Sequence, residues 1–120
     1  MLVFILMGLA SCKSDAEKMD ANRFKTGVFE IPASDGYAKT TIVRTDSLQI
    51  ETYKNKIDTL TIEWKNNFNY TLKMVHPKTA LDAEPIHVKI TNLEENSYEF
   101  EAVIGHSNYI QKGELIKKSN

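Results

Sequence analysis

The chain has 120 residues, of which 15 are Lys or Arg and 16 are Asp or Glu, so its formal net charge is −1. The basic residues are scattered, with no cluster beyond Lys117-Lys118, which excludes the electrostatic footprint of a nucleic-acid-binding surface. Hydrophobic residues make up 42% of the sequence and aromatic residues 9%, which is ordinary for one folded domain of modest size.

An uncharged apolar run over residues 1–10 opens the chain and leads through Ser11 to Cys12, the single cysteine. A membrane-spanning helix needs about 20 apolar residues, whereas the apolar region of a signal peptide has roughly 7–15. The stretch Leu9-Ala10-Ser11-Cys12 is similar to the cleavage motif of bacterial lipoproteins, in which small residues precede a cysteine that receives a diacylglycerol. This resemblance implies that residues 1–11 are a removed signal peptide and that Cys12 carries the lipid.

Two further observations bear on this segment. Signal peptides begin with a positive charge, but no Lys or Arg precedes Cys12, so we expect the true N-terminus to lie upstream of Met1. The alternative is a buried strand in which Cys12 is a buried thiol, and the lack of period-two alternation disfavours it. A disulfide within the chain is excluded, because one cysteine has no partner.

The residues after Cys12 indicate where the protein is held. The stretch Lys-Ser-Asp-Ala-Glu (13–17) resembles the short signal that favours surface export in lipoproteins of the Bacteroidota. The resemblance also implies the outer membrane rather than retention at the inner one, because the residue after Cys12 is Lys13 and not an aspartate. We therefore expect a cell-envelope lipoprotein of the outer membrane, on its periplasmic side or at the cell surface, with a polar tether over residues 12–23.

From Phe24 the apolar residues recur with a period of two, and long helical patterns are lacking. A turn is expected at residues 65–67 and a bulge at Gly113, while the two prolines of residues 77–85 exclude this connection from a sheet. The predicted strands are 24–31, 37–45, 48–53, 58–64, 68–74, 86–90, 98–104 and 109–116.

About eight short strands joined by turns predict an all-β domain over residues 24–120. We expect a small antiparallel up-and-down meander, closed or nearly closed into a barrel, because closure removes the exposed edges that invite aggregation.

Four segments resemble small lipoproteins of the flavobacterial type, a family whose molecular role is not established. Some relatives carry a DNA topoisomerase IV label. This sequence does not support that activity, because it has no recognisable context for a tyrosine nucleophile, no cluster of acidic metal ligands and no basic face. The Phe-x-x-Gly opening at Phe24 and Gly27 also resembles calycin-like (lipocalin-like) barrels, and this implies a fold without implying a ligand. The four segments are Phe-Lys-Thr-Gly-Val-Phe-Glu (24–30), Ile-Val-Arg-Thr-Asp-Ser-Leu-Gln-Ile-Glu (42–51), Ile-Glu-Trp (62–64) and Asn-Tyr-Thr-Leu (69–72).

Five aromatic residues fall on the predicted inner face of the barrel and are candidates to line a ligand site. A barrel of eight short strands has an interior barely wide enough for its own side chains or one small ligand. A filled core is therefore favoured over a cavity for a small apolar ligand. The five residues are Trp64, Phe68, Tyr70, Tyr98 and Phe100.

No catalytic or metal-binding constellation is apparent. His76, His87 and His106 are widely spaced and give no metal signature. The serines lie in turn sequences without a nucleophile motif. We expect no enzyme activity, cofactor or metal, but a binding or accessory role in the envelope; the alternative is a structural or protein-interaction domain with a filled core. Expected partners are the membrane through Cys12, and a small apolar ligand or an envelope protein.

Overall fold

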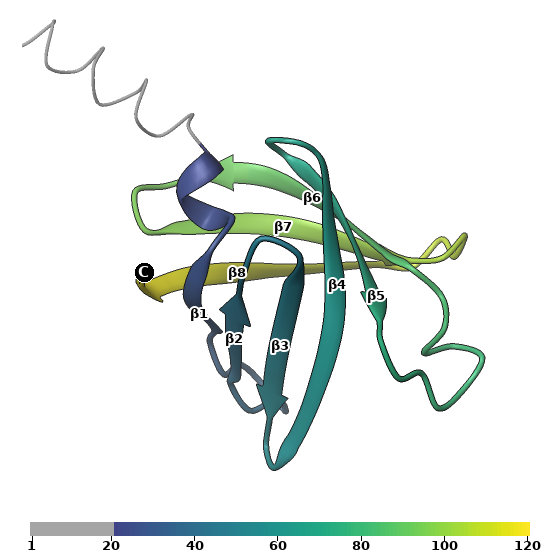
Figure 1. Cartoon of the computed structure of the whole chain (residues 1–120). Coiled ribbons are helices and arrows are strands. Elements are labelled where there is room, and N and C mark those ends of the chain that lie inside the picture. The colour runs from purple at the N-terminus through teal and green to yellow at the C-terminus, as the bar shows by residue number, and fades with distance from the viewer. Residues whose placement is uncertain (1–20) are drawn as a thin grey trace, which may run out of the picture.

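The computed structural model describes residues 21–120, so the predicted lipidation motif Leu9-Ala10-Ser11-Cys12 lies outside the described residues. A short 3-10 helix η1 leads into eight strands, each antiparallel to the next, and β8 pairs with β1 to close an up-and-down barrel (Figure 1). The predicted all-β barrel is thus confirmed. The elements are η1 (Ala21–Phe24), β1 (Gly27–Ile31), β2 (Thr40–Arg44), β3 (Leu48–Tyr53), β4 (Lys56–Asn66), β5 (Asn69–Met74), β6 (Ile86–Leu93), β7 (Ser97–Ile104) and β8 (Ile110–Ser119).

The core lies inside the barrel and takes in η1. Ala21 and Phe24 are completely buried, and the Phe24 ring meets the Tyr98 ring edge-on at 5.1 Å between centroids. The packed domain therefore includes Ala21, ahead of the boundary predicted at Phe24. The remaining buried apolar residues alternate along the strands, as the period of two predicts: Phe29, Ile42, Leu60, Ile62, Tyr70, Leu72, Val88, Ile90 and Leu115.

The turn between β4 and β5 is formed by residues 67 and 68, later than the predicted 65–67. β4 continues through Asn66 with a register shift after Trp64, and Asn67 and Phe68 form the turn. The Asn66 side chain holds this turn, because its Oδ1 accepts a hydrogen bond of 2.8 Å from the backbone N–H of Phe68. The prediction that Phe68 lies on the inner face of a strand is therefore wrong: it is a turn residue with 37% of its surface exposed.

The bulge predicted at Gly113 is also wrong. The β7–β8 register is unbroken from Ser97↔Ile116 to Val103↔Ile110, and Gly113 lies directly opposite Phe100. A Cβ at Gly113 would lie 2.7 Å from Cζ of the Phe100 ring. The glycine is needed because the ring lies over its backbone, and not because the strand deviates there.

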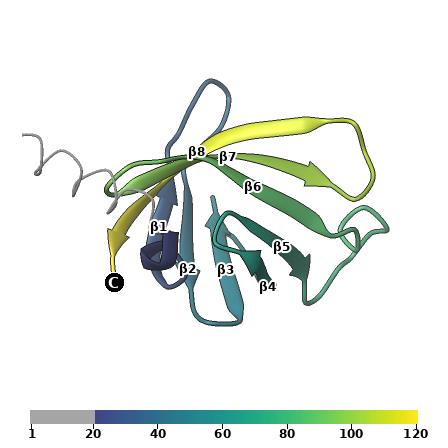
Figure 2. The ribbon, with the colours of Figure 1, turned by 90° about the horizontal axis from the view of Figure 1, so that it is seen from above.

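The closing pair of strands is much shorter than its neighbours. β1 pairs with β8 only at Val28↔Ser119, Phe29↔Lys117 and Glu30↔Ile116. β1 ends at Ile31, and the next residue, Pro32, has no N–H with which to continue a ladder. Beyond this point the β7–β8 hairpin extends away from β1 and β2 (Figures 1 and 2), which leaves one end of the barrel open.

Candidate functional site

The end of the barrel covered by η1 is filled around a buried arginine. Arg44 on β2 is only 2% exposed, yet its guanidinium finds acceptors on every side. Nε and Nη2 donate to Oε1 of Gln49 at 2.9 and 2.7 Å. Nη1 donates to the Phe24 carbonyl at 2.9 Å and to the Tyr98 hydroxyl at 3.2 Å. Nη2 also reaches the Tyr70 hydroxyl at 3.3 Å, so all five N–H donors have a partner.

Aromatic rings surround the same guanidinium. Its Cζ lies 4.9 Å from the ring centroid of Phe29, 5.0 Å from that of Tyr70 and 5.8 Å from that of Trp64. Ring faces carry partial negative charge, so they stabilise a cation that is removed from water. Burial lowers the pKa of Arg44, but the hydroxyls of Tyr70 and Tyr98 raise it by more, so that its pKa lies above the ordinary value.

A partly buried carboxyl, that of Glu51, continues the hydrogen-bonded network from Arg44. Nε2 of Gln49 donates to Oε1 of Glu51 at 2.8 Å, so a neutral amide links Arg44 to Glu51. The pKa of Glu51 lies above its ordinary value, mainly because of burial. Asp58 also raises this pKa, whereas the hydrogen bond from Gln49 and the charge of Arg44 lower it. Burial also raises the pKa of Tyr98 well above its ordinary value, which keeps this hydroxyl neutral. We interpret this hydrogen-bonded network around Arg44, here called the Arg44 network, as stabilising the fold.

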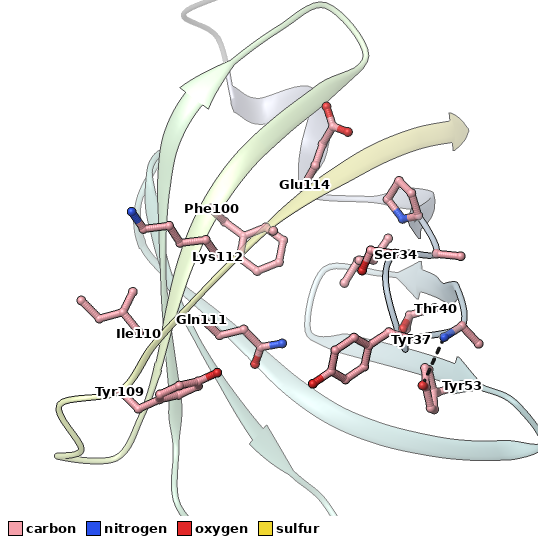
Figure 3. Close-up of a pocket in the computed structure, with 15 residues that line it drawn as sticks. Ser34, Tyr37, Thr40, Tyr53, Phe100, Tyr109, Ile110, Gln111, Lys112 and Glu114 are labelled. Carbon is pink, nitrogen blue, oxygen red and sulfur yellow. Dashed lines mark hydrogen bonds between the residues drawn. The ribbon is translucent and has the colours of Figure 1, made fainter.

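The opposite, open end of the barrel holds a pocket of about 810 Å³, here called the rim pocket. One wall is the loop between β1 and β2 with the end of β3, and the other is the first half of β8 (Figure 3). It is lined by Ile31, Pro32, Ala33, Ser34, Tyr37, Ala38, Thr40, Tyr53, Phe100, Tyr109, Ile110, Gln111, Lys112, Gly113 and Glu114.

The rim pocket combines exposed apolar surface with hydrogen-bonding groups. Tyr37 is 69% exposed, Tyr109 73% and Ile110 50%, which is unusual for residues of this size. The Tyr53 hydroxyl accepts a hydrogen bond of 3.3 Å from the N–H of Ala38 and so ties the β1–β2 loop to β3. Large exposed apolar side chains gathered at a concave site are typical of a binding surface.

Of the five aromatic residues predicted to line a ligand site, Phe100 is the one that lines the rim pocket. Trp64, Tyr70 and Tyr98 surround or contact Arg44 in the filled half, and Phe68 lies in the β4–β5 turn. The indole Nε1 of Trp64 is buried there without a hydrogen-bond partner among the described residues. Trp64, Tyr70 and Tyr98 thus fill the barrel rather than line a cavity.

Arg44, Gln49 and Glu51 in the filled half, and Tyr37 and Tyr109 in the rim pocket, are not among the site residues predicted from the sequence. Arg44, Gln49 and Glu51 share the inner face with Ile42, a position that period-two counting from Ile42 could have identified. Tyr37 and Tyr109 were assigned to strands, but they lie before β2 and β8 begin. The combination of Pro32 and Gly36 was the available signal for a long β1–β2 loop.

Comparison of the chain with family models, with curated proteins and with solved structures gives no match. Within residues 21–120, no group of three or more His, Cys, Asp or Glu side chains is arranged to hold a metal ion. His87 lies 3.3 Å from the Thr71 hydroxyl, and His76 and His106 are exposed in turns. No helix of this part of the chain is long and apolar enough to cross a membrane.

Proposed function

We propose that the protein is a lipid-anchored binding protein of the bacterial cell envelope, held at the outer membrane through Cys12, with the rim pocket as its binding site. The observation that carries this proposal is the contrast between the two ends of the barrel. One end is filled by the Arg44 network, whereas the other holds an open pocket of about 810 Å³, within the usual range of roughly 300–1,000 Å³ for ligand pockets.

The lining supports binding rather than catalysis. Tyr37, Phe100 and Tyr109 offer apolar contact, and Ser34 and Gln111 offer hydrogen bonds, which suits an amphipathic ligand. Among the lining residues, no histidine or cysteine stands beside a hydroxyl to activate it as a nucleophile. The filled half of the barrel favours a second candidate, an envelope scaffold that binds no small molecule.

The anchor is tested on protein extracted from the membranes of its own host. Intact mass should show the mass of the mature chain from Cys12 plus a lipid, and the protein should partition into the detergent phase. Cys12→Ala should remove the lipid, because the thiol is the attachment atom, and should release the chain into the aqueous phase. An unmodified Cys12 in the host protein would overturn this part of the proposal.

The rim pocket is tested with the fluorescent probe 1-anilinonaphthalene-8-sulfonate. We expect saturable binding at one site, and about tenfold weaker binding in the double variant Tyr37→Ser/Tyr109→Ser, because two exposed aromatic anchors are lost. The matched control is Ile57→Ser/Leu81→Ser, which removes exposed apolar side chains (67% and 65%) outside the pocket. If no saturable site is found, or if the two double variants behave alike, the scaffold candidate replaces the binding role.

A further inference from the structure

We propose that the ligand of the rim pocket is a peptide in extended conformation, which adds as a strand to the free edge of β8 over residues 110–114. This inference rests on the proposed function, because it assigns a ligand class to the same pocket. Four features of the rim pocket support it. The β1–β8 ladder ends before residue 114, and alternate backbone groups of β8 point away from β7. The β1–β2 loop opposite does not bond to them, and the lining has an apolar and a polar side.

The free edge exists because β8 has two neighbours of unequal length. β7 pairs with β8 as far as Val103↔Ile110, whereas β1 pairs with β8 no further than Glu30↔Ile116. Among the described residues, 110–114 of β8 are therefore paired on the β7 side only. Such an edge presents a row of backbone donors and acceptors that another extended chain can pair with.

The register shows which backbone groups face the gap. The N–H of Lys117 donates to the carbonyl of Asn96 at 2.6 Å, which extends the β7–β8 ladder by one pair. In an antiparallel pair, alternate residues direct both N–H and C=O to the partner. Since the backbone N–H of Lys117 points to the β7 side, the backbone groups of Gly113 and Gln111 also point to β7. The backbone N–H and C=O of Ile110, Lys112 and Glu114 therefore point away from β7, into the rim pocket.

The opposite wall does not use these groups. Residues 32–39 turn back on themselves, with Ser34 and Tyr37 exchanging backbone hydrogen bonds of 3.1 and 2.8 Å. The turn and loop hydrogen bonds among the described residues do not involve the backbone of residues 110, 112 and 114. Figure 3 shows the pocket between this loop and β8, where an added strand would run about 4.8 Å from β8.

The side chains around the gap indicate what kind of peptide fits. Toward the barrel interior an added strand would meet the apolar side chains of Ile31 and Phe100 and, on the same face of β8 as Gly113, the polar Gln111. Toward solvent it would lie beside Lys112 and Glu114, whose charges are opposite. Successive residues of a strand point to opposite faces, so the fitting ligand alternates apolar and polar residues. A lipid or other amphiphile would leave the three edge N–H groups without a protein partner.

The probe peptide is a fluorescein-labelled hexapeptide of alternating valine and threonine, and its binding is measured by fluorescence anisotropy. Lys112→Pro removes the one edge N–H in the middle of the gap and leaves the β7 ladder intact, because this N–H points away from β7. We expect at least about tenfold weaker peptide binding in this variant. Lys112→Ala loses the same side chain but keeps the N–H, so it is the reference variant against which the effect of Lys112→Pro is measured.

The naphthalene sulfonate probe separates the two proposals. Peptide binding that is weaker in Lys112→Pro than in Lys112→Ala, with equal probe binding in the two variants, supports the strand addition. Probe binding without peptide binding, or peptide binding that is equal in Lys112→Pro and Lys112→Ala, overturns the strand addition and leaves the proposed function standing. If neither ligand binds the parent protein, the proposed function itself fails.

Amide hydrogen exchange measured by NMR on the parent protein keeps the test independent of how Lys112→Pro folds. The amides of Ile110, Lys112 and Glu114 should exchange fast in the free protein and become protected by the peptide. The amides of Gln111 and Gly113 should be protected in both states by β7. Protection of the three edge amides in the free monomer would overturn the proposal, as would their protection in a dimer without peptide, which would make a second copy the occupant.

Discussion

Replacing Arg44 by methionine is expected to lower the free energy of unfolding by about 3–5 kcal/mol, although methionine matches much of its volume. The change leaves four buried acceptors without their donor: Oε1 of Gln49, the Phe24 carbonyl and the hydroxyls of Tyr70 and Tyr98. An unsatisfied buried polar group costs about 1–3 kcal/mol, and the two hydroxyls can still bond each other across 2.6 Å.

Urea unfolding followed by the fluorescence of Trp64, the single tryptophan, measures this loss. Arg44→Lys should fall between the parent and Arg44→Met, because an ammonium keeps the charge but cannot form the two-point contact with Gln49. The control Lys118→Met, at an exposed position, should change stability by less than about 0.5 kcal/mol. A loss below about 1 kcal/mol in Arg44→Met would show that the network does not stabilise the barrel.

Gly27→Ala is expected to destabilise the barrel by about 2–4 kcal/mol, because two penalties coincide there. Gly27 has a φ of 129°, a conformation that residues with a side chain rarely adopt. A Cβ at this position would also lie 2.6 Å from the backbone oxygen of Ser119. Since that oxygen belongs to the strand that closes the barrel, β1 and β8 would have to separate.

Gly36→Ala is the matched control for Gly27→Ala. Gly36 also has a positive φ, 79°, but a Cβ there meets nothing within 4 Å. Gly36→Ala should therefore lower the free energy of unfolding only by the cost of placing alanine at a positive φ, about 1 kcal/mol. Equal losses of stability in the two variants, measured as urea midpoints, would contradict the close approach of β1 to Ser119.

Much of the fold could be predicted because burial follows strand alternation. Leu60 and Ile62 share a buried face with the half-buried Trp64, as the period of two predicts. The inward position of Arg44 and Gln49 was missed because that alternation was traced through apolar residues. A charged side chain occurs at an inner position only when the tertiary structure provides acceptors for it. Gly113 was predicted to form a bulge because a glycine in a strand often marks one. Its role is instead to leave room for the Phe100 ring on the neighbouring strand.

The rim pocket could not be predicted for a different reason. It arises from the relative lengths of strands that are far apart in the chain, because β1 ends at Ile31 while β8 extends beyond it, back to its first residue Ile110. The period of the sequence assigns residues to faces but does not say which residues of β1 lie beside β8. Tyr37 and Tyr109 become a pocket wall only when the barrel closes with that register, and Phe68 leaves the inner face because the Asn66 side chain positions the turn.

The pairing of β1 with β8 also determines when the domain can form. The two strands that close the barrel are the first and the last of the described chain, so the closing contacts have the longest loop to bring together and form slowly. During synthesis, β1 must wait for its partner until residues 116–119 have left the ribosome. Such an order keeps the barrel open until β8 has been synthesised.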